Sequence, residues 1–131
     1  MVRTKRVYEP PGPDDGYRVL VERLWPRGVS KENAHLDAWA RELAPSDELR
    51  RWYGHDPARW EAFRARYRRE LDEPARRDQL DRLVERAATG TVTLVYASRA
   101  GEISNAAVLR DLIAERLSAQ SPDAGSAGAA G

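Results

Sequence analysis

The sequence predicts a small α/β fold with a parallel-type sheet of few strands, about five helices and Rossmann-like layering. Three segments, residues 3–9, 17–24 and 91–97, are predicted to be strands, and the last two have apolar or β-branched residues at the positions that a buried sheet requires. Helical patterns fill the chain between the second and third of these segments, and one more helix follows the third. A strand that returns after a helical crossover favours parallel pairing with a right-handed connection.

Turn-forming residues end each of the predicted strands. The first, residues 3–9, ends at the proline- and glycine-rich loop of residues 10–16. In the second, Val19 and Val21 lie on one face and Leu20 and Leu24 on the other, which predicts burial on both sides as in a layered sheet. The third strand, residues 91–97, is rich in β-branched and aromatic residues and ends before Ser98.

The expected helices have recognisable beginnings and ends. Leu36, Trp39 and Leu43 indicate a first helix, and Ser46 is the expected N-cap of a second that Gly54 ends. A capping Asp56 followed by proline predicts the start of a third, and Ser104 is the expected cap of the last. The buried faces of the last three helices are predicted to be formed by Trp60, Phe63, Tyr67 and Leu71, by Leu80, Leu83, Val84 and Ala87, and by Val108, Leu109, Leu112, Ile113 and Leu117.

Length and composition indicate one domain and exclude several kinds of chemistry. We expect a single domain over residues 1–118 and a disordered tail over residues 119–131, which is rich in alanine, glycine and serine. The chain has no cysteine, so thiol nucleophiles, disulfides and iron–sulfur clusters are excluded. A net charge of +1 argues for neither nucleic acid nor membrane. No apolar run is long enough to span a membrane, and the N-terminus has no signal-peptide core. The expected compartment is the cytoplasm.

The place of a site follows from the predicted topology. In open α/β sheets, ligands bind beyond the carboxyl ends of the strands, where loops lead into helices. Residues 23–28 follow the second strand and residues 98–101 follow the third. If these strands are parallel neighbours, the two turns face each other across one crevice.

Positive charge gathers at this predicted crevice. Arg23 continues the face of Val19 and Val21, and Arg27 lies shortly after it. The backbone of Gly28, together with Lys31 and Arg99, could complete a site for phosphate or carboxylate, although no P-loop or dinucleotide motif is present. The alternatives are that Arg23 pairs with an acid such as Glu22 or Asp37, and that Trp25-Pro26 fills the core while Gly28 only forms a turn.

Catalytic candidates are few. His55, next to Asp56, could transfer a proton, and Ser98 could act as a nucleophile if a base lay within reach. Both have structural alternatives, since Asp56 caps a helix and serine is common in turns. His35 and His55 are the only histidines and are too far apart in sequence to form a metal motif, so no metal site is expected and no particular cofactor is indicated.

A group of four arginines suggests a second class of function. Arg64, Arg66, Arg68 and Arg69 could contact nucleic acid. At 100° per residue, however, they spread around most of the helix and are mixed with Glu61 and Glu70. A solvated helix explains this pattern better than a recognition surface does.

Several stretches resemble a known family. The segments VYEPP (7–11), DGYRVLVERLWPRG (15–28), ELAPS (42–46) and WYGHD (52–56) resemble the YeaO-like proteins, a branch of the domain of unknown function 488. The resemblance spans roughly residues 3–117 and implies a compact α/β protein of the bacterial cytoplasm, with no established activity. The family pattern after the last strand ends in His-Asn-Asn, where this chain has Ile103, Ser104 and Asn105. Only Asn105 matches, so any mechanism that needs a histidine at position 103 is in doubt.

The leading hypothesis is therefore a protein that binds a small anionic ligand, with catalysis left open. The residues expected to bind this ligand are Arg23, Arg27, Gly28, Lys31, Arg99 and Asn105. The alternative is an accessory module that binds nucleic acid or another protein and has no small-molecule site.

Overall fold

The computed structural model describes residues 1–99 and 101–120. Its sheet contains β1 (Val2–Arg6), β2 (Tyr17–Leu20), β3 (Ala38–Trp39) and β4 (Val92–Tyr96), in the order β1-β4-β2-β3. The helices are α1 (Lys31–Ala34), α2 (Asp47–Tyr53), α3 (Trp60–Glu70), α4 (Pro74–Thr89) and α5 (Asn105–Gln120). Short 3₁₀ turns occupy Arg41–Leu43, Pro57–Arg59 and Gly101–Ile103. The predicted α/β fold is confirmed.

All strand pairs in the described sheet are parallel, and β4 lies between β1 and β2. Val2 pairs with Val92 on one side of β4, and Tyr17 pairs with Val92 on the other. Every residue of β4 is buried, which explains its continuous run of apolar and β-branched residues. The carboxyl ends of β2 and β4 therefore lie side by side at one edge of the sheet.

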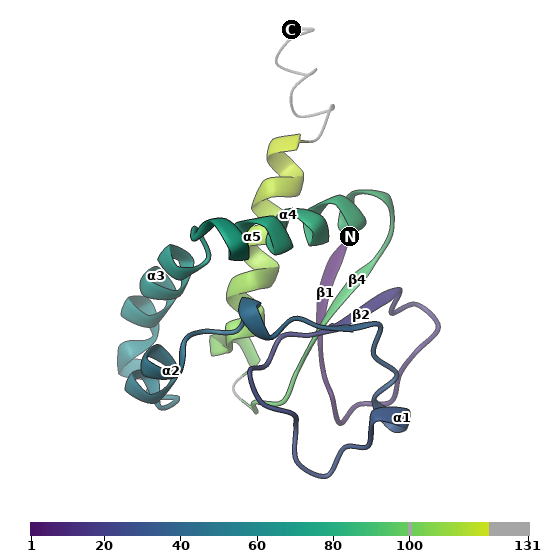
Figure 1. Cartoon of the computed structure of the whole chain (residues 1–131), viewed down its shortest axis with the longest axis horizontal. Coiled ribbons are helices and arrows are strands. Elements are labelled where there is room, and N and C mark those ends of the chain that lie inside the picture. The colour runs from purple at the N-terminus through teal and green to yellow at the C-terminus, as the bar shows by residue number, and fades with distance from the viewer. Residues whose placement is uncertain (100, 121–131) are drawn as a thin grey trace, which may run out of the picture.

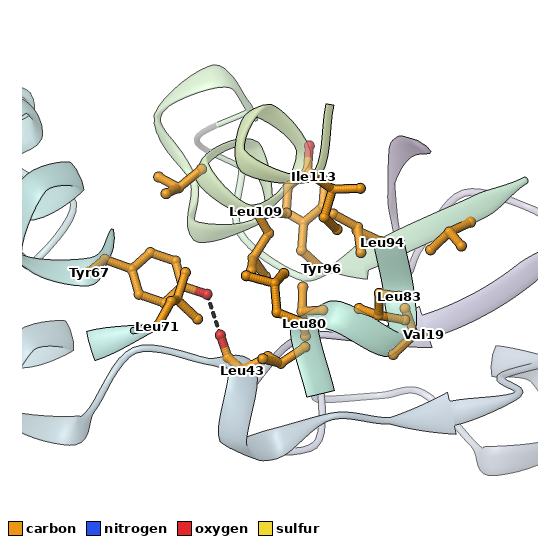
Figure 2. Packing of buried hydrophobic residues seen from close by; sticks show 14 of the residues in the cluster. Val19, Leu43, Tyr67, Leu71, Leu80, Leu83, Leu94, Tyr96, Leu109 and Ile113 are labelled. Carbon is orange, nitrogen blue, oxygen red and sulfur yellow. Dashed lines mark hydrogen bonds between the residues drawn. The ribbon is translucent and has the colours of Figure 1, made fainter. Parts of the chain in front are cut away.

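The larger hydrophobic cluster lies between one face of the sheet and helices α3, α4 and α5. Val19 and Leu94 from the strands pack with Leu80 from α4 and Leu109 from α5 (Figure 2). The Tyr67 hydroxyl points from α3 toward the Leu43 carbonyl and donates a hydrogen bond to it (Figure 2). This bond satisfies a buried polar group and fixes α3 to the turn that follows β3.

The opposite face of the sheet has a thinner cover. Leu20 and Val95 pack there with Val7 from the segment after β1 and with Ala34 from α1. In Figure 1, α1 lies on the other side of the strands from α2 and α3. The sheet is thus covered on both faces, as the apolar residues on both faces of β2 predicted.

Two details of the sequence interpretation are wrong. The helix expected from Leu36, Trp39 and Leu43 is absent: Ala38–Trp39 is the edge strand β3, which pairs with β2, and only Arg41–Leu43 forms a 3₁₀ turn. Leu36 and Trp39 pack on the thin face of the sheet, whereas Leu43 joins the larger cluster, so the chain crosses the sheet edge between them. Leu24 is 66% exposed instead of buried, because β2 ends at Leu20.

The predicted helix caps are present. The Ser46 hydroxyl accepts a hydrogen bond from the Leu49 N–H at the start of α2, and Gly54 ends that helix with a left-handed φ of 53°. Asp56 caps Pro57–Arg59, the turn that leads into α3, and the Ser104 hydroxyl accepts from the Ala107 N–H in α5. Most of the expected disordered tail, residues 121–131, lies outside the described residues. No helix within the described ranges has both the length and the hydropathy of a membrane span.

Candidate functional site: a cationic pocket at the strand ends

A pocket of about 580 Å³ opens at the carboxyl ends of β2 and β4. Its walls come from the segment after β2 (residues 22, 23 and 27), the segment after β4 (97–98), the end of α2 with its turn (50, 51 and 53–55) and the residues where α5 begins (104–105). These segments are far apart in the sequence and meet because β2 and β4 are neighbours. The volume is in the range of small-molecule sites.

Four arginines line the pocket: Arg23, Arg27, Arg50 and Arg51. Arg23 holds the chain that leads into α2, because its Nε donates to the Pro45 carbonyl at 3.1 Å. Its Nε also lies 3.9 Å from the Asp47 carboxylate, which Arg50 approaches to 3.4 Å. Arg23 therefore serves the fold as well as contributing charge.

Arg27 and Arg51 are different. Both are exposed, and within residues 1–99 and 101–120 neither guanidinium makes a hydrogen bond or an ion pair. Each can thus donate its N–H groups to a ligand without first losing a protein partner. Guanidinium groups bind phosphate and carboxylate oxygens through two parallel hydrogen bonds.

Glu22 is the single carboxylate among the described residues that line the pocket. It accepts a hydrogen bond of 2.8 Å from the Ala97 N–H and another from the Ser98 N–H, which ties the end of β2 to the end of β4. Burial raises the pKa of Glu22, while these two N–H groups and the positive charges of His55 and Arg50 oppose that rise.

Two aromatic side chains supply apolar surface. Tyr53 and Phe63 stack with ring centroids 4.1 Å apart and an interplanar angle of 18°, and both rings border the pocket. The Tyr53 hydroxyl donates to the Ile103 carbonyl at 2.8 Å, so α2 is fixed to the start of α5. Burial, and then the charge of Asp56, raise the pKa of Tyr53, so this hydroxyl remains a donor at neutral pH.

The turn after α2 has an unusual backbone. Gly54 and His55 both adopt positive φ values, 53° and 58°, although only glycine does so without strain. This pair of left-handed residues reverses the chain at the pocket wall and leaves His55 exposed at its rim. His55 also lies against Tyr53, with ring centroids 5.9 Å apart.

The structure brings together some of the residues that the sequence pointed to. Arg23, Arg27, His55, Ser98 and Asn105 line the pocket. Asn105 also makes a hydrogen bond within the fold, because its side-chain amide donates to the Val21 carbonyl at 2.7 Å. Whether these residues bind a ligand stays a prediction.

Three other expected residues lie elsewhere. Gly28, Lys31 and Arg99 are exposed and are not among the described residues that border the pocket. Gly28 has a φ of 74°, which supports the alternative that it forms a turn. Lys31 is in α1, which packs on the face of the sheet opposite to helices α3, α4 and α5.

The arginines of α3 are largely engaged within the protein. Arg64 lies 3.7 Å from Glu61, and Arg68 makes two hydrogen bonds to Glu115. Arg66 stacks over the Trp52 ring at 4.2 Å. This arrangement is typical of a solvated helix. In the described part of the chain, no cluster of three His, Cys, Asp or Glu residues could hold a metal ion.

Comparison with known proteins decides the family. Residues 1–130 match the family described as the inactive DUF488-N3 subclade. The chain belongs to the DUF488 family. It is 46% identical over 112 residues to the uncharacterized protein Rv3073c of Mycobacterium tuberculosis (strain H37Rv), covering 86% of this chain and 92% of the relative. It is 38% identical over 110 residues to the uncharacterized protein YeaO of Escherichia coli (strain K12), covering 84% and 94%. These values confirm the YeaO-like assignment, and no solved structure matches the chain.

Sequence reasoning missed several residues of this DUF488 pocket. Glu22 lies inside the family-like segment 15–28, and a charged residue directly after buried Val21 was the signal that could have identified it. Arg50 and Arg51 carried no comparable signal, because they reach the pocket only through the packing of α2 beside the end of β2.

Proposed function

We propose that this DUF488 protein binds a small ligand carrying a phosphate or carboxylate group in the pocket at the ends of β2 and β4. The observation that carries the proposal is the lining itself, in which four arginines border one pocket. Two of them, Arg27 and Arg51, have no hydrogen-bonding or ion-pair partner among the described residues. An anion placed between them would gain charge-assisted hydrogen bonds.

A binding role is favoured over catalysis. The family description itself calls the subclade inactive. His55, the candidate proton carrier, lies on an exposed turn at the rim, whereas the anion-binding guanidinium groups need no proton transfer to act. The proposed setting is the bacterial cytoplasm, where phosphorylated and carboxylated metabolites are abundant ligands for such a pocket.

Calorimetric titration with inorganic phosphate, butyl phosphate and citrate tests the proposal. We expect saturable binding of at least one of these anions to the wild-type chain. Arg27→Glu and Arg51→Glu should each weaken it by about tenfold or more, because a hydrogen bond to a charged group contributes about 1.5–3 kcal/mol. Both variants should keep the wild-type unfolding midpoint, since neither guanidinium has a hydrogen-bond or ion-pair partner to lose among the described residues.

Arg82→Glu is the matched control. Arg82 is an exposed arginine on α4, away from the pocket, and the same charge reversal there should leave the affinity unchanged. Equal weakening by Arg82→Glu would mean that only the overall charge matters. Absence of binding for all three anions would refute the proposed function.

A further inference from the structure

We propose that the ligand of this pocket is dipolar: it carries a positively charged or N–H donor group that Glu22 accepts, in addition to the anion that the arginines bind. This inference rests on the proposed function and narrows the class of ligand. Its chemistry is that of a small zwitterion, such as an amine-bearing phosphate, and not that of a simple polyanion.

The first argument is a missing ion pair. Glu22 and four arginines line the same pocket, yet no arginine nitrogen lies within 4.0 Å of the Glu22 carboxylate among the described residues. Arg23 and Arg50 approach Asp47 instead. A carboxylate and guanidinium groups attract strongly at short range, so their separation here leaves the Glu22 charge and the guanidinium groups of Arg27 and Arg51 able to contact a third group.

The second argument is the state of the carboxylate. Two backbone N–H groups, from Ala97 and Ser98, hold Glu22 in place. Burial raises its pKa, because removal from water disfavours the charged form. A cationic or N–H donor group of a ligand would stabilise that charged form.

The third argument is the surface available between the charges. The rings of Tyr53 and Phe63, with Ala44 and Pro45, give the pocket apolar lining. An alkyl or ring spacer of the ligand can pack on these groups while its two ends reach opposite charges. A ligand with negative charge at both ends would instead place one of them against Glu22.

The test is a matched series of ligands measured by calorimetry with the full chain at pH 7. The series consists of aminoalkyl phosphates with two to six carbons, each compared with the alkyl phosphate in which a methyl group replaces the ammonium group. We expect the best aminoalkyl phosphate to bind about tenfold or more tightly than its alkyl counterpart. The best spacer length would report the separation between Glu22 and the arginines.

Glu22→Gln should remove this advantage, so that the variant binds the aminoalkyl phosphate and its alkyl counterpart with about equal affinity. Glu85→Gln, at an exposed position on α4, should change neither affinity. If Glu22→Gln disturbs folding, the wild-type series alone still decides the question.

The outcomes separate the two proposals. Equal affinity for amine and methyl members at every length would overturn the dipolar inference and leave the anion site standing. Failure of both kinds of phosphate to bind would overturn the proposed function, and the inference with it.

Discussion

The effect of removing the Asp15 carboxylate on the free energy of unfolding can be worked out from its contacts and its pKa. Its side chain is 2% exposed and accepts hydrogen bonds from the Gly12 N–H at 3.0 Å, from the Lys5 ammonium at 3.0 Å and from the Arg18 guanidinium. Arg18 is itself buried and donates onward to the carbonyls of Ala34 and His35. Asp15→Asn removes the charge at the centre of this network and places an N–H donor against two cations.

The magnitude follows from the pKa of Asp15. Burial alone would raise this pKa, but the hydrogen bonds from Gly12, Lys5 and Arg18 lower it from 3.8 to about 2. This lowering is worth about 2 kcal/mol of stability above pH 3.8, since a tenfold change in proton affinity is worth about 1.4 kcal/mol. Breaking a buried ion pair costs about 3–5 kcal/mol in total. We therefore expect Asp15→Asn to lower the free energy of unfolding by about 3 kcal/mol at pH 7.

Urea unfolding at a series of pH values measures this effect. Because the folded pKa is depressed, the stabilisation by Asp15 is complete above pH 3.8 and is lost as the pH falls through 2. The difference between wild type and Asp15→Asn should thus narrow by about 2 kcal/mol between pH 7 and pH 2. Asp14→Asn, at the exposed neighbouring position, is the control and should have almost no effect. A constant difference over this pH range would refute the reasoning.

Three further substitutions test packing by the same unfolding assay. Gly16→Ala should destabilise by at least about 2 kcal/mol, because φ is 62° and a Cβ would lie 2.3 Å from the Thr91 carbonyl oxygen; an unchanged midpoint would contradict this contact. Phe63→Ala should cost about 3–5 kcal/mol, since this ring is 2% exposed, and a cost below about 1 kcal/mol would mean that the site can collapse. Tyr67→Phe should cost about 1–3 kcal/mol by leaving the buried Leu43 carbonyl without its donor, and a neutral effect would show that the bond contributes nothing.

Local patterns predicted much of the fold. The alternation in β2, the β-branched run of β4 and the caps at Ser46 and Ser104 are properties of a few adjacent residues, and the structure has each of them. The parallel pairing of β2 and β4 followed from chain order alone.

The error at residues 36–43 has a different origin. The apolar residues there have helical spacing, but Trp39 lies in the edge strand β3 and pairs with Leu20 of β2. Its ring also packs edge-on against Trp25, with ring centroids 5.3 Å apart. Hydrophobic periodicity reports that side chains are buried, not which face of the sheet buries them. Only the tertiary pairing of β3 distinguishes the two cases.

The sequence predicted where the candidate pocket lies, but only some of the residues that line it. The carboxyl ends of two parallel strands gave its position, and Arg23, Arg27 and Asn105 were within reach of that argument. Arg51 lines the pocket because α2 packs beside the strand ends. Lys31 does not line it, because α1 packs on the other face of the sheet. Both depend on helix placement, which no local pattern encodes.

The most direct test of the central claim is an NMR titration of ¹⁵N-labelled protein with butyl phosphate. If the pocket at the ends of β2 and β4 binds the anion, the backbone amide signals of Gly54, His55, Ala97 and Ser98 should shift saturably, and Arg51→Glu should abolish the shifts. Shifts confined to the outer surface of α3 and α5, or no shifts at millimolar ligand, would contradict the account.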